Sequence, residues 1–360
     1  MPSKKILMPV RTVAEWGGVH EWTVDAASSL VARGNDVTFV GQGDTFRERA
    51  QAVGASFVEI DWNEWSHDIE RIASDVEFDL IFSHAPGGRQ IGLAVNEIAK
   101  KEHVVMVHGA YHDYMYEWSD QVDAFVAASP SLVHFVQRFG RVAPWKVTNL
   151  PNAAPSETFN LPLVSHDEKL SGGVGRILTA SRLSPDKVPQ IGAVEEAAES
   201  LSRLYPDIKW VIDIYGDGPL KAIYEQRYAA LSQRLTNVNY EFHGWVAPHE
   251  VPNLMNRAYL TVTAGMAGMR ALAAGSLCLG AGARDTVGIQ VDRNLRAGLW
   301  SNFGDHGVMR FQASSISDDL SRYAASGAYD DAIERARITV KNGNHQDIVN
   351  KMMFSALQCS

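Results

Sequence analysis

The segment Ile177-Leu-Thr-Ala-Ser-Arg-Leu-Ser-Pro-Asp-Lys187 combines an apolar run with a charged loop. The run is typical of a buried strand, and two cations, Arg182 and Lys187, follow it. A glycine turn, Gly216-Asp-Gly218-Pro219, comes after the next apolar run. A guanidinium binds phosphate oxygens in pairs and an ammonium acts as a point charge, so the two cations suit a diphosphate. The alternative is a pair of solvated loop charges, because Lys and Arg are mostly surface residues.

Short β-rich runs alternate with longer helical patterns along the chain, which predicts a parallel, doubly wound sheet in each half. The runs of the first half lie near residues 6–10, 37–41, 57–60, 80–84, 104–108 and 124–128. Those of the second half lie near residues 177–181, 210–215, 238–243, 260–264 and 277–280. The polar stretch 156–172 has no sustained apolar period and predicts a linker between an N-terminal domain, 1–155, and a C-terminal domain, 173–344.

A glycine pair, Gly17-Gly18, separates the first apolar run from a helical pattern that ends at Gly34. The pair is therefore predicted at a helix N-terminus. There the backbone can approach a phosphate closely, and free N–H groups favour an anion. The alternative is an ordinary tight turn.

Composition narrows the classes of function. With 360 residues, 46% of them hydrophobic, the chain can bury the cores of about two domains. A formal charge of −9 gives no broad basic field for nucleic acid or anionic lipid. The sequence has no apolar run of the ~18 residues that a membrane span needs, and no signal-peptide core, so we expect a soluble, cytoplasmic protein. Its only two cysteines, Cys278 and Cys359, make a disulfide framework improbable.

Several short motifs follow one another along the chain: Gly17-Gly18-Val19, Ser83-His84, Val107-His108, Leu150-Pro-Asn152, Arg182 to Lys187, Tyr215 to Pro219 and Phe242-His-Gly244. The same order is found in retaining glycosyltransferases of the GT-B fold, and the chain resembles family 4 of that class. It implies two Rossmann-like domains facing across a cleft, with a last helix near 345–360 packed back on the first domain. It also implies transfer of a hexose or pentose from a nucleotide-diphosphate sugar, such as a UDP-sugar, with retention at the anomeric carbon.

The resemblance assigns roles to residues on both domains. It places Arg182 and Lys187 on the diphosphate and His108 nearest the transferred sugar, although His108 could instead be a partly buried structural histidine. Further donor-side residues are Gly17, Gly18, Gly216, Gly218, Trp245, Val246, Gly265 and Arg270. Acceptor-side candidates are Glu15, His84, His112 and Asp113. In a retaining reaction the diphosphate itself can take the acceptor proton. An inverting reaction would need a base, for which Glu15, His112 and Asp113 are the candidates.

One stretch departs from the family pattern. The family has two glutamates eight positions apart, one near the sugar hydroxyls and one near the ribose, whereas this chain has Val262 and Arg270 there. Near a helix N-terminus the charge of Arg270 would oppose the helix dipole unless an anion lies close. Arg270 is therefore expected to pair with a donor phosphate or an acidic sugar, or else to turn to solvent or to a carboxylate.

No cofactor and no metal is expected, because the sequence lacks Asp-x-Asp, His-Glu-x-x-His and paired Cys-x-x-Cys motifs. The acceptor stays open among saccharides, lipid-linked compounds and small molecules, with nucleic acid less favoured by the acidic charge; the donor base and the oligomeric state also stay open. Two other classes remain. The first is a catalytically impaired protein that binds nucleotide sugars, and the second is a phage-type glycosyltransferase that acts on modified DNA.

Overall fold

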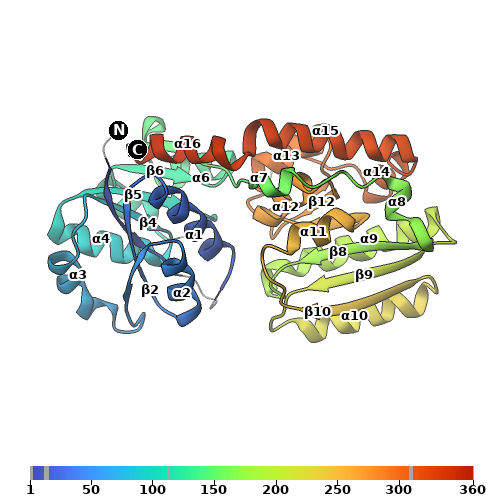
Figure 1. Cartoon of the computed structure of the whole chain (residues 1–360), viewed down its shortest axis with the longest axis horizontal. Helices are drawn as coiled ribbons and strands as arrows, with labels where there is room; N and C mark the ends of the chain where they lie inside the picture. The colour runs from blue at the N-terminus through green and yellow to red at the C-terminus, as the bar shows by residue number, and fades with distance from the viewer. Residues whose placement is uncertain (1–2, 12–15, 112, 308–310, 360) are drawn as a thin grey trace. The chain divides into compact units, whose positions relative to one another are not determined.

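A computed structural model describes residues 3–11, 16–111, 113–307 and 311–359. The chain divides into two compact units (Figure 1). Unit 1 comprises Met1–Pro151 with Ile348–Ser360, and unit 2 comprises Asn152–Asp347. Each unit is an α/β domain built on its own largely parallel sheet, which confirms the predicted fold class. In the described ranges, no helix has both the length and the apolar character that crossing a membrane requires.

The sheet of unit 1 has seven parallel strands in the order β3-β2-β1-β4-β5-β6-β7. Their bounds are β1 Lys5–Pro9, β2 Asp36–Gly41, β3 Ser56–Glu59, β4 Leu80–His84, β5 Glu102–Val107, β6 Ala124–Ala127 and β7 Val147–Asn149. The six predicted strands are present. The short edge strand β7 was not predicted, because its three residues are too few to show a period.

Helices connect these strands, and their ends follow local sequence signals. Ser129 accepts a hydrogen bond from the backbone N–H of Leu132, and Pro130 occupies the first turn, so α6 begins there. The helices are α1 Gly18–Val31, α2 Asp44–Ala52, α3 Ile69–Asp75, α4 Gly87–Ala99, α5 Met115–Trp118, α6 Pro130–Phe139 and α16 Gln346–Ala356. Within unit 1, α16 packs beside α1: Asn350 donates to the Ser29 hydroxyl over 2.9 Å.

The sheet of unit 2 has six strands in the order β10-β9-β8-β11-β12-β13, with β13 antiparallel to β12. Their bounds are β8 Val174–Ala180, β9 Lys209–Tyr215, β10 Val238–Gly244, β11 Leu260–Thr263, β12 Leu277–Ala281 and β13 Thr286–Ile289. Strands β8 and β9 pair in register up to Ala180 and Tyr215. The loops that follow these two strands therefore leave the sheet at the same edge.

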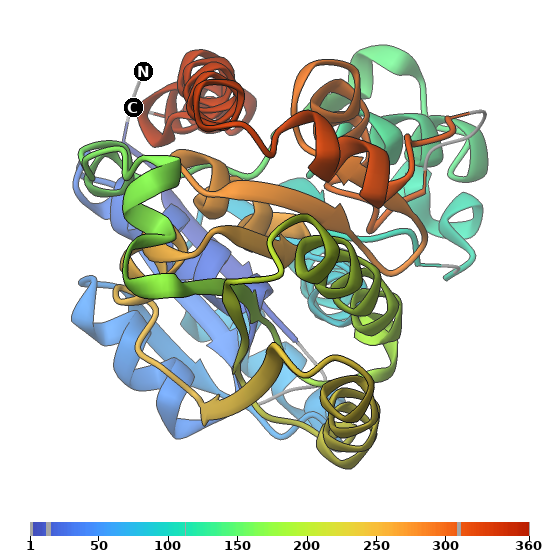
Figure 2. The same ribbon diagram turned by 90° about the vertical axis from the view of Figure 1, so that its right-hand side faces the viewer.

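Helices cover both faces of this sheet, and each face has its own hydrophobic core. One core joins α9, α10 and α14 to the side chains of Trp210, Ile212 and Ile214, and the other joins α12 to Leu178 and Cys278. Helix α15 contributes side chains to both cores. Figure 2 shows α9 and α10 on one side and α15 on the other. Trp210 is fully buried, and burial of a large apolar side chain stabilises a fold by about 1.5–3 kcal/mol. The helices are α7 Ser156–Phe159, α8 His166–Lys169, α9 Val188–Leu204, α10 Lys221–Arg234, α11 Val251–Arg257, α12 Gly265–Ala273, α13 Asp292–Ser301, α14 Ile316–Arg322 and α15 Ser326–Asn344.

The stretch 156–172, expected to be a linker, contains α7 and α8 and belongs to unit 2. Helix α8 forms because Ser165 and Glu168 make a reciprocal capping box. Short 3₁₀ turns complete the secondary structure: η1 Trp65–Asp68, η2 Ser119–Gln121, η3 Pro144–Lys146, η4 Ser171–Gly173 and η5 Pro185–Lys187.

Candidate functional site

The loops after β8, β9 and β10 are hydrogen-bonded to one another. The N–H of Leu183 donates to Asp217 O over 3.0 Å, and the N–H of Gly216 donates to Gly244 O over 2.7 Å. The loop that carries Arg182 and Lys187, which we call the cation loop, therefore lies beside the predicted glycine turn, Gly216–Gly218. They lie beyond the carboxyl ends of parallel strands, where open α/β sheets bind their ligands.

Glycine is required at both ends of that turn. Gly216 has φ 120° and Gly218 has φ 156°, both in the region that side chains disfavour. A Cβ on Gly216 would lie 2.1 Å from Ser181 O, and one on Gly218 would lie 2.5 Å from Leu183 O. The turn can thus pack directly against the backbone on either side of Arg182, and any larger residue would displace it.

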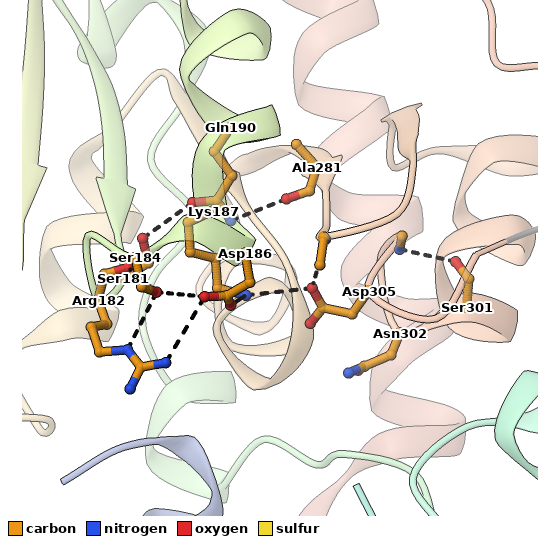
Figure 3. A network of polar contacts seen from close by, with 12 residues as sticks. Ser181, Arg182, Ser184, Asp186, Lys187, Gln190, Ala281, Ser301, Asn302 and Asp305 are labelled. Carbon is orange, nitrogen blue, oxygen red and sulfur yellow. Dashed lines mark hydrogen bonds and ion pairs between the residues drawn. The ribbon is translucent and has the colours of Figure 1, made fainter. Parts of the chain in front are cut away.

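Lys187 lies between two carboxylates (Figure 3). Its Nζ is 3.3 Å from Asp186 Oδ2 and 3.4 Å from Asp305 Oδ1. Arg182 is more exposed: its Nε donates to the Ser184 hydroxyl over 3.3 Å, and its Nη2 is 3.9 Å from Asp186 Oδ1. The cluster formed by Arg182, Asp186, Lys187 and Asp305 balances two positive charges with two negative ones. We call it the charge cluster.

The charge cluster keeps Lys187 protonated. Burial lowers the pKa of Lys187, but the attraction of Asp305 and Asp186 outweighs burial, so the pKa is raised above its usual value. Burial has the opposite effect on Asp186 and raises its pKa. The hydrogen bond from Ser184 and the charge of Lys187 outweigh burial, so the pKa of Asp186 is lowered overall. An ammonium has three N–H donors, and two of the directions around Lys187 are taken by carboxylates. The third can bind an anion.

Asp305 was not predicted from the sequence. It follows α13 in a loop, Asn302-Phe-Gly-Asp-His-Gly307, whose glycines signal a turn but not a site. The Asp305 carboxylate also accepts a hydrogen bond from the N–H of Ala283, over 3.1 Å, at the end of β12. Gln190 ties the same strand end to the cation loop, because it accepts from Ser181 Oγ over 3.1 Å and donates to Ala281 O over 3.0 Å (Figure 3).

The segment after β10 and the start of α12 hold other predicted donor-side residues. Trp245 follows β10 and is 63% exposed, and Val246 is half-buried. Gly265 begins α12 with φ 62° and donates its N–H to Asn302 O over 3.2 Å. The exposed indole of Trp245 is free to stack on a flat ring such as a base.

The prediction that the charge of Arg270 opposes the helix dipole is wrong. Arg270 lies in the last turn of α12, where a cation is favourable, and not near its N-terminus. It is five residues from Gly265, which is about 7.5 Å along a helix axis, a distance that a long arginine side chain can span. Val262 is fully buried within β11, opposite Leu279 of β12, so its side chain does not reach the end of the strand.

In unit 1, α1 begins at the predicted glycine pair. Gly17 is the residue before the first turn, and its carbonyl accepts the N–H of Glu21 over 3.1 Å. A Cβ built on Gly17 or Gly18 would have no atom of the other described residues within 4 Å, so these residues leave space beside the backbone at the start of this helix. That arrangement suits a group that approaches the main chain closely.

His84 lies behind His108. Its Nδ1 is 2.8 Å from Nε2 of His108, the two rings stack with centroids 5.1 Å apart, and the edge of Trp22 meets the His108 ring at 5.3 Å. His84 is fully buried, and burial together with the charge on His108 holds its pKa well below the usual value. A residue that binds the acceptor must be accessible to it. Because His84 is fully buried, it cannot contact a ligand directly.

The tautomers of this pair follow from burial. Nε2 of His84 is buried and has no hydrogen-bond partner among the described residues, so a proton there would be a costly unpaired donor. The proton of neutral His84 is therefore favoured on Nδ1, from which it donates to Nε2 of His108. Neutral His108 then carries its own proton on Nδ1.

Asp113, another acceptor-side candidate, pairs with Arg89. Nη2 of Arg89 is 2.9 Å from Asp113 Oδ2, both side chains are mostly buried, and the guanidinium lies 4.4 Å above the Trp118 ring. Removing one member of such a pair leaves an uncompensated buried charge, so Asp113 has a clear structural role. The remaining two candidates, Glu15 and His112, lie outside the described residues.

One group in the described part of the chain has the geometry of a metal site. Ligand atoms of Asp213, Glu241 and His243 lie within 4.8 Å of one another. However, Nη1 of Arg176 already contacts both Asp213 oxygens at 2.9 and 2.8 Å, and Nε2 of His243 is 2.8 Å from the same carboxylate. The Arg176 guanidinium already neutralises the Asp213 carboxylate that a metal ion would need as a ligand. These residues are therefore an ion-pair network.

Residues 16–157 match the family model described as Glycosyltransferase Family 4. No curated protein matches the chain by sequence. Among solved structures, a glycosyltransferase from Rickettsia africae is 14% identical with a TM-score of 0.73, covering 99% of this chain and 98% of that one. HepE from Anabaena in complex with UDP is 16% identical with a TM-score of 0.72, covering 98% and 99%. Sucrose-phosphate synthase from Thermosynechococcus elongatus is 13% identical with a TM-score of 0.64, covering 99% and 98%.

At these identities the solved structures establish the fold, which is GT-B. The family match adds sequence evidence from unit 1, the part of the chain that contains Gly17, Gly18 and His108. Together they give the GT-B fold of the chain and a similarity to Glycosyltransferase Family 4 over residues 16–157.

Proposed function

We propose that the protein transfers a sugar from a nucleoside-diphosphate sugar, with UDP as the nucleotide, to an acceptor hydroxyl. The observation that carries the proposal is the charge cluster beside the Gly216–Gly218 turn, at the carboxyl edge of the sheet in unit 2. UDP is favoured because solved structures of HepE, which has the same fold, contain UDP and UDP-glucose.

In the proposed reaction Arg182 and Lys187 bind the diphosphate and stabilise the charge that develops on it as it leaves. The bond between the anomeric carbon and the diphosphate oxygen breaks, and a bond from the acceptor oxygen to the same carbon forms. With retention, the acceptor proton passes to a diphosphate oxygen on the same face. No protein base is then needed, which agrees with the engagement of Asp113 by Arg89.

His108, Gly17 and Gly18 are proposed contributors from unit 1, and Gly216, Gly218, Trp245, Val246, Gly265 and Arg270 from unit 2. In its favoured tautomer, neutral His108 accepts at Nε2 from His84 and carries its own proton on Nδ1. Retention, metal independence and a cytoplasmic location stay predictions from the sequence.

Calorimetric titration with UDP, GDP, ADP and uridine tests the donor site. We expect UDP to bind far more tightly than uridine, because the charge cluster recognises phosphate, and EDTA to leave the affinity unchanged. Release of glucose from UDP-glucose, followed by chromatography, tests the bond cleavage. If none of the three diphosphates binds better than uridine, the proposal is wrong.

A catalytically impaired protein that binds nucleotide sugars is the second candidate. It is favoured by the buried position of Val262 and by the arginine at position 270, which leave neither of the family's two glutamates. Binding of UDP-glucose without any release of glucose, over hours and with an excess of saccharide acceptors, would support this candidate over the enzyme.

A further inference from the structure

The loop that carries Asp305 is packed backbone against backbone. A Cβ on Gly282 would lie 2.1 Å from the Asp305 nitrogen, and one on Gly304 would lie 2.1 Å from Asp285 O. The carbonyl of Gly304 also accepts the N–H of Asp285 over 3.0 Å. Glycine at both positions therefore lets the loop approach the end of β12 and fixes where Asp305 emerges from it.

The Asp305 carboxylate is held in one orientation with one oxygen open. Oδ1 accepts from the N–H of Ala283 over 3.1 Å and contacts Lys187 Nζ at 3.4 Å. Oδ2 lies 3.1 Å from the position of a Cβ on Gly265, so the glycine there leaves room for the carboxylate. In the described ranges no donor reaches Oδ2, and the side chain is 19% exposed, so a ligand can contact it.

This position matches the layout of a nucleotide sugar. The sugar is bonded directly to the diphosphate, so its hydroxyls must lie beside whatever cation binds that diphosphate. A carboxylate accepts hydrogen bonds from hydroxyl groups and repels phosphates and acidic sugars. The two family positions cannot do this, because Val262 is apolar and buried and Arg270 can only donate.

We propose that Asp305, from the loop after α13, binds the hydroxyl groups of the donor sugar and selects a neutral sugar over an acidic one. The inference rests on the proposed function, because it needs a nucleotide sugar on Lys187. It assigns the sugar-binding carboxylate to an element of the chain in which no family motif lies.

Asp186 provides a matched control. Its carboxylate is as close to Lys187 as that of Asp305, at 3.3 Å against 3.4 Å. It does not border Gly265, since its other contacts are to Ser184 and Arg182. Asp186→Asn and Asp305→Asn therefore remove the same charge beside Lys187, but only Asp305→Asn weakens an acceptor on the Gly265 side.

The experiment measures the affinity of the wild-type protein, Asp305→Asn and Asp186→Asn for UDP, UDP-glucose and UDP-glucuronate by calorimetry. We expect Asp305→Asn to lower the affinity for UDP-glucose, relative to the affinity for UDP, by at least tenfold. The substitution should also reduce the ratio of the affinity for UDP-glucose to that for UDP-glucuronate. Asp186→Asn is expected to change the affinity for all three ligands by a similar factor. Asparagine can still accept from the N–H of Ala283, and a thermal unfolding midpoint reports whether the loop is intact.

Equal effects of the two substitutions on the ratio of UDP-glucose to UDP affinity would overturn the inference while leaving the proposed function in place. Failure of the wild-type protein to bind UDP or UDP-glucose would instead refute the proposed function, and the inference with it. If Asp305→Asn unfolds, Asp305→Glu keeps the charge and moves the acceptor by one methylene; an unchanged sugar preference in that variant also overturns the inference.

Discussion

Replacing Lys187 with methionine should weaken UDP binding by at least 100-fold and leave uridine binding unchanged. Two effects add. The lost charge-assisted hydrogen bond is worth about 1.5–3 kcal/mol. In addition, Asp186 and Asp305, which lie 3.3 and 3.4 Å from Nζ in the intact protein, would face the diphosphate without a counter-ion. At an effective dielectric constant of about 20, unit charges about 5 Å apart interact by about 3 kcal/mol before salt screening.

A 100-fold change in affinity corresponds to ~2.7 kcal/mol. The lower estimate for the lost hydrogen bond, about 1.5 kcal/mol, reaches this value together with about half of the unscreened repulsion. Arg182→Met is the control, because Arg182 is 36% exposed and 3.9 Å from Asp186, so its loss should cost less, about tenfold. Adding Asp305→Asn to Lys187→Met should restore part of the UDP affinity by removing one repulsive charge. Calorimetry with UDP and uridine decides. A larger loss from Arg182→Met, or an equal loss for uridine, would show that Lys187 does not bind the diphosphate.

Three other predictions follow from the structure. Arg270→Glu should lower UDP affinity more than tenfold by calorimetry if Arg270 reaches the donor as we propose; unchanged affinity removes it from the site. Gly216→Ala should lower the melting temperature and weaken UDP binding together, because its Cβ would lie 2.1 Å from Ser181 O; a stable variant with normal binding contradicts the required turn. Burial lowers the pKa of His103 from 6.5 to about 4. Between these pH values the unfolded state binds a proton at His103 that the folded state does not, so His103 should contribute a fall of about 3 kcal/mol to the free energy of unfolding as the pH drops. Denaturant titrations at several pH values should show a shallower fall for His103→Gln, and an identical slope would contradict this cause.

Regular patterns in the sequence predicted most of the fold. The buried strands β1, β4 and β5 contain continuous apolar runs of three or more residues, and such runs are typical of parallel sheets covered on both faces. Strand β7 was missed because it has only three residues, and strand β13, Thr286–Ile289, because it contains a glycine, which is depleted in strands. The helices in 156–172 were missed because they are single turns, too short to show an apolar period, although the Ser165-x-x-Glu168 capping box of α8 can be read in the sequence.

The site was predicted where a motif and a strand end coincide. Arg182, Lys187 and the Gly216–Gly218 turn follow strands, so their proximity could be inferred from the parallel topology. Asp305 could not, because it lies 118 residues from Lys187 and its loop reaches β12 through glycine contacts that only coordinates reveal. The burial of His84 was equally hidden, since a histidine at a strand end can point to either side.

The return of α16 to unit 1 has a consequence for synthesis of the chain. Unit 2 is continuous, whereas unit 1 needs residues from both ends: Lys4 Nζ donates to Leu357 O over 3.0 Å, and Arg33 lies 4.5 Å above the Phe354 ring. During translation, unit 1 therefore cannot complete its core once its own strands have been made, because it must wait until all of unit 2, Asn152–Asp347, has been synthesised. Synthesis of unit 1 begins first, yet its closing contacts are the last of the two units to become available.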